Sequence, residues 1–372
     1  MAPLPETHHA LVQRVYAEPL KVEDIPVPKP TAGSAVIKVE VANIISYMRD
    51  IYNGVRKYQY PTPLVPGTMC IGRVAALGSD ATLLKEGQLA YVDCTIRGRD
   101  DPGAIILSGI AEGGTEGSKA LMHGEWRDSS YAEYMKAPLE NCHPVDEAKF
   151  CSPVSEGGLG YNIGQLAWLG IPLVPYGGLK SINLQAGETV VIAPATGGFG
   201  GGAVLIALAM GARVIAMGRN ADALAKLKKF DSRVETVQMV GDVEKEVAAL
   251  KKFGRIDAFL DISPSQAQDS THFKSCILSL RPEGRVSLMG GILGDLPLPH
   301  RFIMRFNITL KGKWMYYRED IPALIKLIEH GNLKLDHVKL IGTYPLEEWK
   351  EAFDVAADKT GLGEIVLLKP QY

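Results

Sequence analysis

The middle of the chain alternates short apolar runs with longer segments rich in helix-forming residues. Residues 189–193 (TVVIA) are an unbroken run dominated by Val and Ile, which is typical of a strand buried on both faces. Helix formers follow over 203–210, and residues 213–217 are again short and apolar. The same alternation predicts helices over 221–230, 243–253 and 266–280, and strands over 236–240, 258–261 and 285–289. Successive strand-helix units predict a parallel, doubly wound sheet with its ligand crevice at the carboxyl ends of the strands.

The two ends of the chain have a different pattern. Before residue 160, short β-rich runs at 35–41, 72–77 and 88–94 are separated by Pro and Gly, which predicts an all-β or barrel-like module. Residues 307–311 are expected to add a last strand to the parallel sheet. The final predicted strand, 363–368, is expected to return to the N-terminal module. We therefore predict three segments: 1–165, 166–312 as the nucleotide domain, and 313–372 as the return.

A glycine-rich turn follows the first strand of the parallel sheet. Five of the six residues from 197 to 202 are Gly, which permits a tight turn and lets a pyrophosphate approach the backbone amides at the start of the next helix. Strand, turn, helix and strand at these lengths predict a dinucleotide-binding unit. The residues expected to contact the dinucleotide here are Thr196, Gly197, Gly198, Phe199 and Gly200.

Composition and charge narrow the functional class. The chain of 372 residues is 46% hydrophobic and 22% charged, with a formal net charge of -2. These values are typical of a globular protein with a sizeable core, and nothing in them indicates a nucleic-acid or membrane partner. The N-terminal residues lack a charged start followed by an apolar core, so we expect a cytoplasmic enzyme acting on a small molecule. The five cysteines form no CxxC pair, and Cys142, His143 and Cys151 are expected to be structural residues.

Several stretches resemble the medium-chain dehydrogenase/reductase superfamily. They are LVPGTMCIGRV (64–74), SYAEYMK (130–136) and AGETVV (186–191), and the order of β module, nucleotide domain and C-terminal return is similar as well. The resemblance implies an α/β protein with a GroES-like β-barrel catalytic domain and a Rossmann doubly wound parallel sheet. The turn PATGGFG resembles that of the zinc-free quinone oxidoreductase and enoyl reductase branches, and Pro194 is the residue that departs from their pattern. A proline at the end of a buried strand has no backbone N–H to donate to the neighbouring strand.

The zinc-dependent branch is contradicted by the residues at its ligand positions. In an alignment with that branch, Ile45 stands at the expected Cys, Tyr47 at the Ser, and Thr68-Met69 at the expected His-Glu pair. Thr and Met cannot replace an imidazole and a carboxylate as zinc ligands. The place of the four-cysteine structural zinc lobe, 97–129, contains no Cys. We therefore expect no metal.

Without a metal, the acceptor oxygen of the substrate needs a hydrogen-bond donor. Tyr47 is the leading candidate, since a tyrosine keeps its proton at neutral pH, and a half-buried packing role is the competing interpretation. Tyr52 and Asp50 remain rivals because two alignments disagree in register. The substrate pocket is expected to use Tyr47 and four further residues: Tyr52, Thr68, Tyr161 and Asn162.

The cofactor is predicted to be NADPH. Arg219 follows the second strand of the parallel sheet, where an NAD-specific fold usually presents an acidic residue, and its guanidinium suits a 2′-phosphate. A solvated surface Arg is the alternative. Asn43 resembles the superfamily's Asn that approaches the nicotinamide. The carboxyl ends of later strands add expected cofactor contacts at Ser263, Met289, Gly290 and Gly291, and Asp261 is expected either to join them or to cap the next helix.

Together these features predict an NADPH-dependent, zinc-independent oxidoreductase that reduces an activated C=C bond or a quinone-like small molecule. Two alternatives remain: an alcohol or carbonyl dehydrogenase of the same superfamily, and a catalytically silent NADPH-binding sensor or scaffold. A homodimer is expected through the edge of the nucleotide sheet, with 307–311 as the exposed strand.

Overall fold

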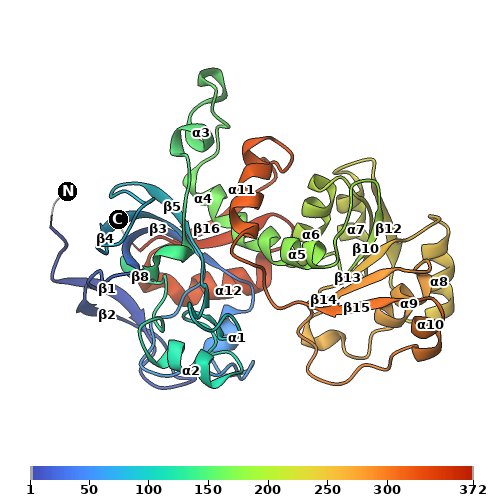
Figure 1. Ribbon diagram of the computed structural model, residues 1–372, viewed down its shortest axis with the longest axis horizontal. Coiled ribbons are helices and arrows are strands. Elements are labelled where there is room, and N and C mark those ends of the chain that lie inside the picture. Colours follow the sequence, from blue (N-terminus) through green and yellow to red (C-terminus); the bar gives the residue numbers. More distant parts are fainter. Residues whose placement is uncertain (1–2, 371–372) are drawn as a thin grey trace. The chain divides into compact units, whose positions relative to one another are not determined.

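The computed structural model describes residues 3–370, which divide into two compact units (Figure 1). The first unit runs to Gly170 and resumes over Leu335–Thr360 and from Glu364 onward. The second comprises Ile171–Lys334 with the short segment Gly361–Gly363. The expected pairing of a β-rich module with a parallel α/β sheet is confirmed.

The second unit contains a six-stranded, fully parallel sheet in the order β12-β11-β10-β13-β14-β15. Its strands are β10 (Thr189–Ala193), β11 (Arg213–Gly218), β12 (Val234–Gln238), β13 (Ala258–Asp261), β14 (Arg285–Leu288) and β15 (Thr309–Gly312). Every predicted strand of this sheet is present, and β12 begins two residues earlier than predicted. The order reverses beside β10, which places a ligand crevice at the carboxyl ends of β10 and β13.

Helices cover both faces of this sheet (Figure 1). They are α5 (Gly170–Ser181), α6 (Gly198–Ala209), α7 (Ala221–Lys228), α8 (Val243–Lys251), α9 (His272–Ser279) and α10 (His300–Arg305). A further helix of this unit, α11 (Asp320–Glu329), packs on α5. Alternate strand residues such as Val191 and Ala193 pack with Leu250 of α8 and Phe273 of α9 in one core. The two-residue side-chain period of a strand sends the intervening residues to the opposite face.

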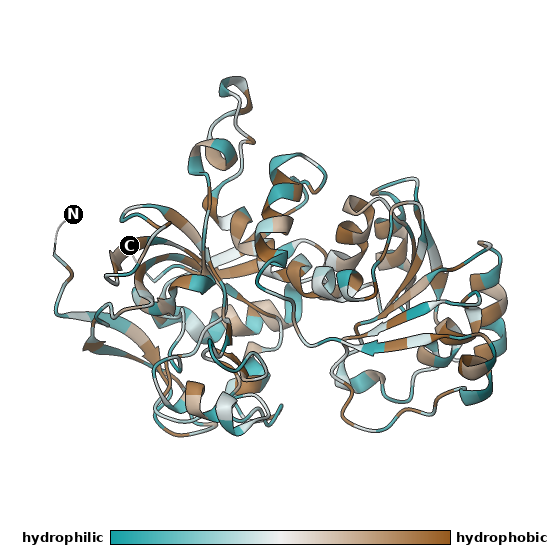
Figure 2. Cartoon of the chain, in the orientation of Figure 1, coloured by the Kyte–Doolittle hydropathy of each residue, from teal (hydrophilic) through white to brown (hydrophobic). Residues whose placement is uncertain are grey.

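Helix α6 begins at Gly198, five residues before the predicted start at 203. Its glycines are therefore mostly packing positions rather than turn positions. A Cβ at Gly200 would lie 2.1 Å from the carbonyl oxygen of Pro194, and one at Gly201 would lie 2.5 Å from the Leu362 side chain. Hydrophobic residues fill the rest of the helix (Figure 2). Close approach of helix and strand requires residues without a Cβ here.

Pro194 fits the turn without breaking the sheet. Strand β10 ends at Ala193, and the neighbouring bonds are made by the Ala193 carbonyl, which accepts from the Ile262 amide, and by the Ala195 amide, which donates to Met217. The peptide bond between Ala193 and Pro194 is cis. The missing amide of Pro194 therefore falls immediately beyond the last ladder residue.

The second unit extends farther along the chain than the predicted 166–312. Helix α11, which the prediction assigned to the return segment, groups with the second unit. The reason is local packing, since the Lys180 ammonium of α5 donates to the buried Asp320 carboxylate of α11 at 2.5 Å. A Cβ at Gly177 of α5 would also meet Tyr316 at 2.6 Å.

The first unit is built on a mixed sheet in the order β16-β17-β3-β4-β5-β9, with β8 paired to β3. Its strands are β3 (Ser34–Ile44), β4 (Cys70–Leu77), β5 (Leu89–Val92), β8 (Tyr134–Pro138), β9 (Cys142–Pro144), β16 (Lys339–Tyr344) and β17 (Glu364–Leu368). The pairing of β17 with β3, from Val366–Ile44 to Leu368–Ala42, confirms that the last strand returns to the N-terminal module.

Shorter elements complete the first unit. They are β1 (Thr7–Val12), β2 (Lys21–Pro26), α1 (Met48–Tyr52), β6 (Thr95–Arg97), β7 (Ile105–Leu107), α2 (Glu116–His123), α3 (Glu147–Cys151), α4 (Ile163–Leu166) and α12 (Trp349–Lys359). The segment 97–129, which stands in place of a structural zinc lobe and contains no Cys, includes β7 and α2. No helix within residues 3–370 has the length and apolar character needed to cross a membrane.

Candidate functional site

The amino end of α6 presents an open backbone surface. Gly197 caps the helix without a side-chain hydrogen bond, and no atom lies within 4 Å of the Cβ that a larger residue would carry there. Around Gly198 the nearest atom to such a Cβ is the Gly361 carbonyl oxygen at 3.8 Å. The first-turn amides of a helix have no acceptor within the helix and carry its positive dipole end. This surface therefore fits a pyrophosphate group. Phe199, also predicted to contact the dinucleotide, lies half-buried in the same turn.

Thr196 packs on the end of β11, and Arg219 is the next residue after that strand. Thr196 packs so closely on the end of β11 that a Cβ at Gly218 would lie 2.7 Å from its methyl carbon. Arg219 follows directly in the connection to α7, where its carbonyl accepts from Gln238 at 3.1 Å and its side chain is exposed. Asn220 caps α7 by accepting from the Ala223 amide, and Asp222 is exposed in the first turn of that helix. The end of the second strand is therefore followed by an exposed arginine, and Thr196 packs on the strand's last residue.

The carboxyl ends of β13 and β14 are joined beyond the last assigned strand residues. The Met289 amide donates to the Asp261 carbonyl at 2.9 Å, and the Gly291 amide donates to the Ser263 carbonyl at 2.7 Å. The Ser263 hydroxyl is buried and donates to Asp261, while the Met289 side chain packs against α5 at Gly178. The side chains of Ser263 and Met289 are therefore engaged within the protein, and cofactor contacts at these strand ends remain a prediction for the backbone groups. Asp261 does not cap α9, whose N-cap is Thr271.

Asn43 carries an amide with unmet hydrogen-bonding capacity. The residue lies in β3 with 1% of its surface exposed, and neither its side-chain oxygen nor its side-chain nitrogen has a hydrogen-bond partner. Its backbone carbonyl accepts from the Thr68 hydroxyl at 2.8 Å and from the Tyr131 hydroxyl at 3.0 Å. A buried amide without partners costs free energy, so this side chain fits a polar ligand group such as a carboxamide.

Tyr47 stands at the start of α1 with its side chain half-buried. The Arg56 guanidinium carbon lies 4.0 Å from the centre of its ring. Burial raises the pKa of Tyr47 above the usual value of a phenol, and the nearby Tyr58 adds to this while Arg56 opposes it. The side chain therefore keeps its proton at neutral pH, as a hydrogen-bond donor must.

Two of the other predicted pocket residues are held in the interior of the first unit. The Tyr52 hydroxyl donates to the Gly109 carbonyl at 2.8 Å and accepts from the Gly67 amide at 3.3 Å. Burial raises its pKa well above the usual value. The Thr68 hydroxyl donates to the Asn43 carbonyl, and its backbone is bonded to Ser130. These bonds favour structural roles, and Thr68 orients the strand that carries Asn43.

Tyr161 and Asn162 also use their polar atoms locally. The Tyr161 hydroxyl accepts from the Leu335 amide at 3.2 Å, and burial raises its pKa. Asn162 caps α4, accepting from the Gln165 amide, while the Gln165 side chain accepts from the Asn162 amide. A reciprocal capping box accounts for the choice of Asn at this position.

The residues at the expected zinc positions do not fit the metal. Ile45 is buried, Met69 packs against Gly170, and the Thr68 hydroxyl is donated to a backbone carbonyl. Across residues 3–370, no group of three or more His, Cys, Asp or Glu side chains is placed to hold a metal ion. Burial also raises the pKa values of Cys70, Cys94 and Cys142 above that of a free thiol, which disfavours the thiolate that a metal requires. No mechanistic step is assigned to a metal.

Two polar residues of these regions were not predicted from the sequence. Arg56 stacks on Tyr47, nine residues away, across a turn whose geometry carried no sequence signal. His272 lies in α9 with its Nε2 atom 2.8 Å from the Ser263 hydroxyl oxygen. A single His within the predicted helix 266–280 gave no indication of a buried partner at the end of the preceding strand.

Two family models match the chain. The model described as alcohol dehydrogenase GroES-like domain matches residues 31–147, and the one described as zinc-binding dehydrogenase matches residues 198–330. Among curated proteins, the chain is 24% identical to alcohol dehydrogenase notN of Aspergillus sp. (strain MF297-2) over 361 residues, which is 94% of this chain and 95% of that protein. It is 25% identical to acryloyl-coenzyme A reductase of Metallosphaera sedula, over 96% of this chain and 99% of the relative.

Solved structures share the fold. A putative alcohol dehydrogenase from Sinorhizobium meliloti 1021 is similar with a TM-score of 0.76 and 24% identity, covering 99% of this chain and 98% of that chain. An alcohol dehydrogenase (rspB) from E. coli CFT073, solved in complex with NADH, has a TM-score of 0.76 and 17% identity over 98% of this chain and all of that chain. At these identities the likeness establishes the architecture of both units.

Proposed function

We propose that this chain, an oxidoreductase of the medium-chain dehydrogenase/reductase superfamily, uses NADPH to reduce an activated C=C bond or a quinone-like small molecule without a metal. The observation that carries the proposal is the chemistry at Ile45, Thr68 and Met69, none of which offers a catalytic zinc ligand. An enone or quinone can be reduced without a metal, because the negative charge that develops on its oxygen is delocalised as an enolate or phenolate.

The choice of NADPH rests on Arg219. Arg219 is exposed and directly follows β11, whose last residue, Gly218, packs against Thr196 of the glycine turn. A planar, permanently charged fork binds a 2′-phosphate through charge-assisted hydrogen bonds. The same position in an NAD-specific site would favour a carboxylate.

NADPH supplies the hydride when it is bound. The chain contributes the open amides at the start of α6 for the pyrophosphate, and the Asn43 amide is available for the carboxamide. Tyr47 holds a proton at its phenolic oxygen and donates a hydrogen bond, or that proton, to the substrate oxygen. Arg56 over the ring holds Tyr47 in place.

A panel assay tests this function. Purified protein is assayed with NADPH or NADH against an enone, a quinone and an aldehyde, and with NADP⁺ or NAD⁺ against a secondary alcohol, each with and without a chelator. We expect NADPH-dependent turnover of the enone or the quinone that the chelator leaves unchanged. Turnover restricted to the alcohol and aldehyde, and lost with chelation, would instead show a metal-dependent dehydrogenase.

An alcohol or carbonyl dehydrogenase is the second candidate. It is favoured by the names of relatives such as alcohol dehydrogenase notN, whereas acryloyl-coenzyme A reductase bears a name that describes reduction of an activated double bond. A silent NADPH-binding protein is the third, and it predicts binding without turnover of any member of the panel.

We also propose a homodimer formed through the edge of the parallel sheet. Strand β15 ends the sheet order, and exposed large hydrophobic side chains lie along the chain near it at Leu293, Leu298, Met304, Trp314 and Tyr317. An edge strand with unpaired backbone groups beside exposed apolar residues is suited to pairing with a second copy.

A further inference from the structure

Four polar side chains, three of them buried and the fourth half-buried, form a chain of hydrogen bonds at the carboxyl end of β13. The Asp261 carboxylate lies 2.5 Å from the Ser263 hydroxyl, and that hydroxyl lies 2.8 Å from Nε2 of His272. Nδ1 of His272 lies 2.7 Å from the Ser270 hydroxyl. Asp261, Ser263 and His272 are each at most 4% exposed. We call this set the Asp261–Ser270 network.

The chemistry of these groups determines which atom is the donor and which the acceptor in each hydrogen bond. A carboxylate only accepts, so the single hydroxyl proton of Ser263 goes to Asp261. The Ser263 oxygen must then accept, which requires a proton on Nε2 of His272. In the neutral imidazole Nδ1 accepts from the Ser270 hydroxyl. Every member is therefore satisfied, and a single tautomer of His272 completes the network.

The arrangement is not that of a hydrolytic triad. Asp261 and Ser263 both face the same ring nitrogen, with the Asp261 carboxylate 3.7 Å from Nε2, whereas a triad places the acid at the other nitrogen. The Ser263 hydroxyl is also too buried to attack a substrate. The network must act through the backbone that it holds.

The backbone that the network holds is that of the carboxyl-terminal ends of β13 and β14. The carbonyl groups of Asp261 and Ser263 accept from the amides of Met289 and Gly291, so the network fixes two successive bonds of this edge. A Cβ at Gly290 would lie 2.8 Å from the Asp261 carboxylate and 2.8 Å from the Ser263 carbonyl oxygen. The segments that follow β13 and β14 are therefore packed so closely that position 290 has no space for a side chain.

We propose that His272 is a positioning residue for the nicotinamide end of the bound dinucleotide. Through Ser263 and Asp261 it holds the peptide groups at 261–263 and 289–291 in the geometry that the nicotinamide carboxamide meets. The inference rests on the proposed function, because it requires a dinucleotide at the carboxyl ends of these strands. The sequence predicted that Ser263 contacts the cofactor, whereas in this proposal its side chain positions the backbone groups that make the contact.

The experiment compares two ligands on the same variants. NADPH carries the nicotinamide, and 2′-phospho-ADP-ribose lacks it but keeps the remainder. We expect His272→Leu to weaken NADPH binding about tenfold and to lower kcat, while affinity for 2′-phospho-ADP-ribose stays within twofold of the wild type. His272→Gln, which keeps an N–H near Ser263, should recover most of the loss.

Thr271→Val is the matched control. Thr271 precedes His272 and donates to the buried Glu246 carboxylate at 2.8 Å, away from Asp261. It should lower Tm without separating the two ligands. Should His272→Leu fail to fold, Ser270→Ala removes only the outer partner and is read in the same way. Equal weakening of both ligands, or no weakening of either, overturns the proposal.

The wild-type protein separates this inference from the function on which it rests. If the wild type binds neither NADPH nor NADH, the proposed function fails and the inference fails with it. If it prefers NADH, only the cofactor choice is wrong, and the same comparison with NADH and ADP-ribose decides the role of His272.

Discussion

Tyr47 and Tyr52 lie five residues apart and differ in burial and in their neighbours. Tyr52 donates to Gly109 and accepts from Gly67, so its oxygen is committed to the backbone. Tyr47 lies half-buried at the start of α1 with a cation over its ring. The proposed function gives the donor role to Tyr47, and Tyr52 serves as a matched control.

Tyr47→Phe should lower kcat by about 10²- to 10⁴-fold, because it removes a positioned proton donor and little else. Affinity for NADPH should be unchanged. Since burial raises the pKa of Tyr47, the rate should show no loss from its deprotonation as the pH rises from 7 to 10. Steady-state kinetics across this pH range provide the measurement.

Tyr52→Phe should behave in the opposite way. It leaves the Gly67 amide without its partner and should cost about 1–3 kcal/mol of unfolding free energy while kcat stays near the wild-type value. If the two substitutions affected kcat alike, the assignment of the donor to Tyr47 would be wrong.

Arg219→Gln should raise the KM for NADPH by about 10- to 100-fold and leave the KM for NADH within about twofold, because only NADPH carries the 2′-phosphate. Arg233→Gln is the control, since that guanidinium is already paired with Asp231 at 2.8 Å. Comparable KM changes in both variants would remove Arg219 as the specificity residue.

The sequence predicted some site residues for physical reasons that are local. Arg219 and the glycines follow a strand directly, so their place at the strand end needs no knowledge of the rest of the fold. The roles of Thr68 and Tyr161 depend on partners 25 and 174 residues away, Asn43 and Leu335. Such pairings are set by tertiary structure and leave no trace in local spacing.

At the scale of the element, the glycines of the α6 turn divide into two kinds. Gly197 has an extended backbone and open space where a Cβ would stand, whereas a Cβ at Gly200 would lie 2.1 Å from the Pro194 oxygen. One glycine leaves room for a ligand, and the other lets the helix approach the strand.

Gly197→Ala should therefore fold with unchanged Tm and bind NADPH at least about tenfold more weakly, since its methyl group occupies the approach to the amides. Gly200→Ala should lower the unfolding free energy by about 1–3 kcal/mol through overpacking. Thermal unfolding and fluorescence titration with NADPH measure the two effects. A Gly197→Ala variant with wild-type affinity contradicts the proposed phosphate site.

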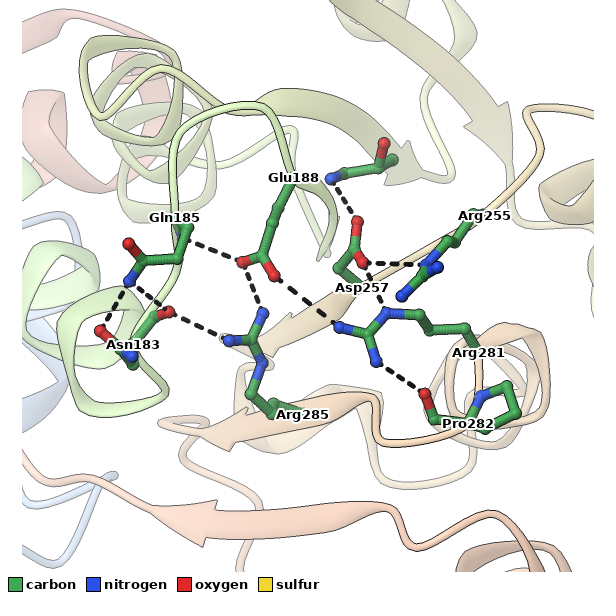
Figure 3. A network of polar contacts seen from close by, with 9 residues as sticks. Asn183, Gln185, Glu188, Arg255, Asp257, Arg281, Pro282 and Arg285 are labelled. Carbon is green, nitrogen blue, oxygen red and sulfur yellow. Dashed lines mark hydrogen bonds and ion pairs between the residues drawn. The ribbon is translucent and has the colours of Figure 1, made fainter.

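A network of charged side chains lies at the amino-terminal ends of strands in the same sheet (Figure 3). Asp257 accepts from the Thr189 amide at 2.9 Å and from Arg281 at 2.6 Å, while Glu188 pairs with Arg281 and Arg285. These residues stand at the amino ends of β10, β13 and β14. Their place, away from the carboxyl ends of the strands, indicates a role in stability.

Burial acts to raise the pKa of Asp257, but the bonds from Arg281 and Thr189 outweigh it and lower the pKa below the usual value. A carboxyl group whose pKa is lowered by folding stabilises the protein above its unfolded pKa of about 3.9, and this contribution disappears as the pH falls through the folded pKa. Asp257→Asn should cost about 1–3 kcal/mol at pH 7, with a gap to the wild type that shrinks below about pH 4. Urea unfolding at several pH values tests this, and a gap independent of pH would refute the ionic role.

At the scale of the whole molecule, both sheets and the return of the last strand could be predicted because they rest on long, strongly patterned segments. The strands β10 and β13 were placed to the residue, and the pairing of β17 with β3 followed from the order of elements. The start of α6 was missed because helix propensity disfavours Gly, and here packing overrides propensity. Helix α11 was assigned to the other segment because its contact with Lys180 spans 140 residues.

The proposed dimer predicts a mass of twice the 40.3 kDa chain in size-exclusion chromatography with light scattering. Trp314→Glu, which places a charge on an exposed aromatic next to β15, should shift the protein toward the monomer. Val55→Glu provides the control on an exposed hydrophobic residue of the first unit. A wild-type protein that runs as a monomer at all concentrations contradicts the proposal.

The most direct test of metal-free hydride delivery is isotope transfer. Protein whose metal content has been measured as below one-tenth equivalent is given an enone and NADPH carrying deuterium at both C4 positions of the nicotinamide, and the product is analysed by mass spectrometry. We expect one deuterium on the β-carbon of the saturated ketone, formed at the same rate with and without added zinc. A protein that forms this product only after zinc is restored, or that reduces only the carbonyl group, would contradict it.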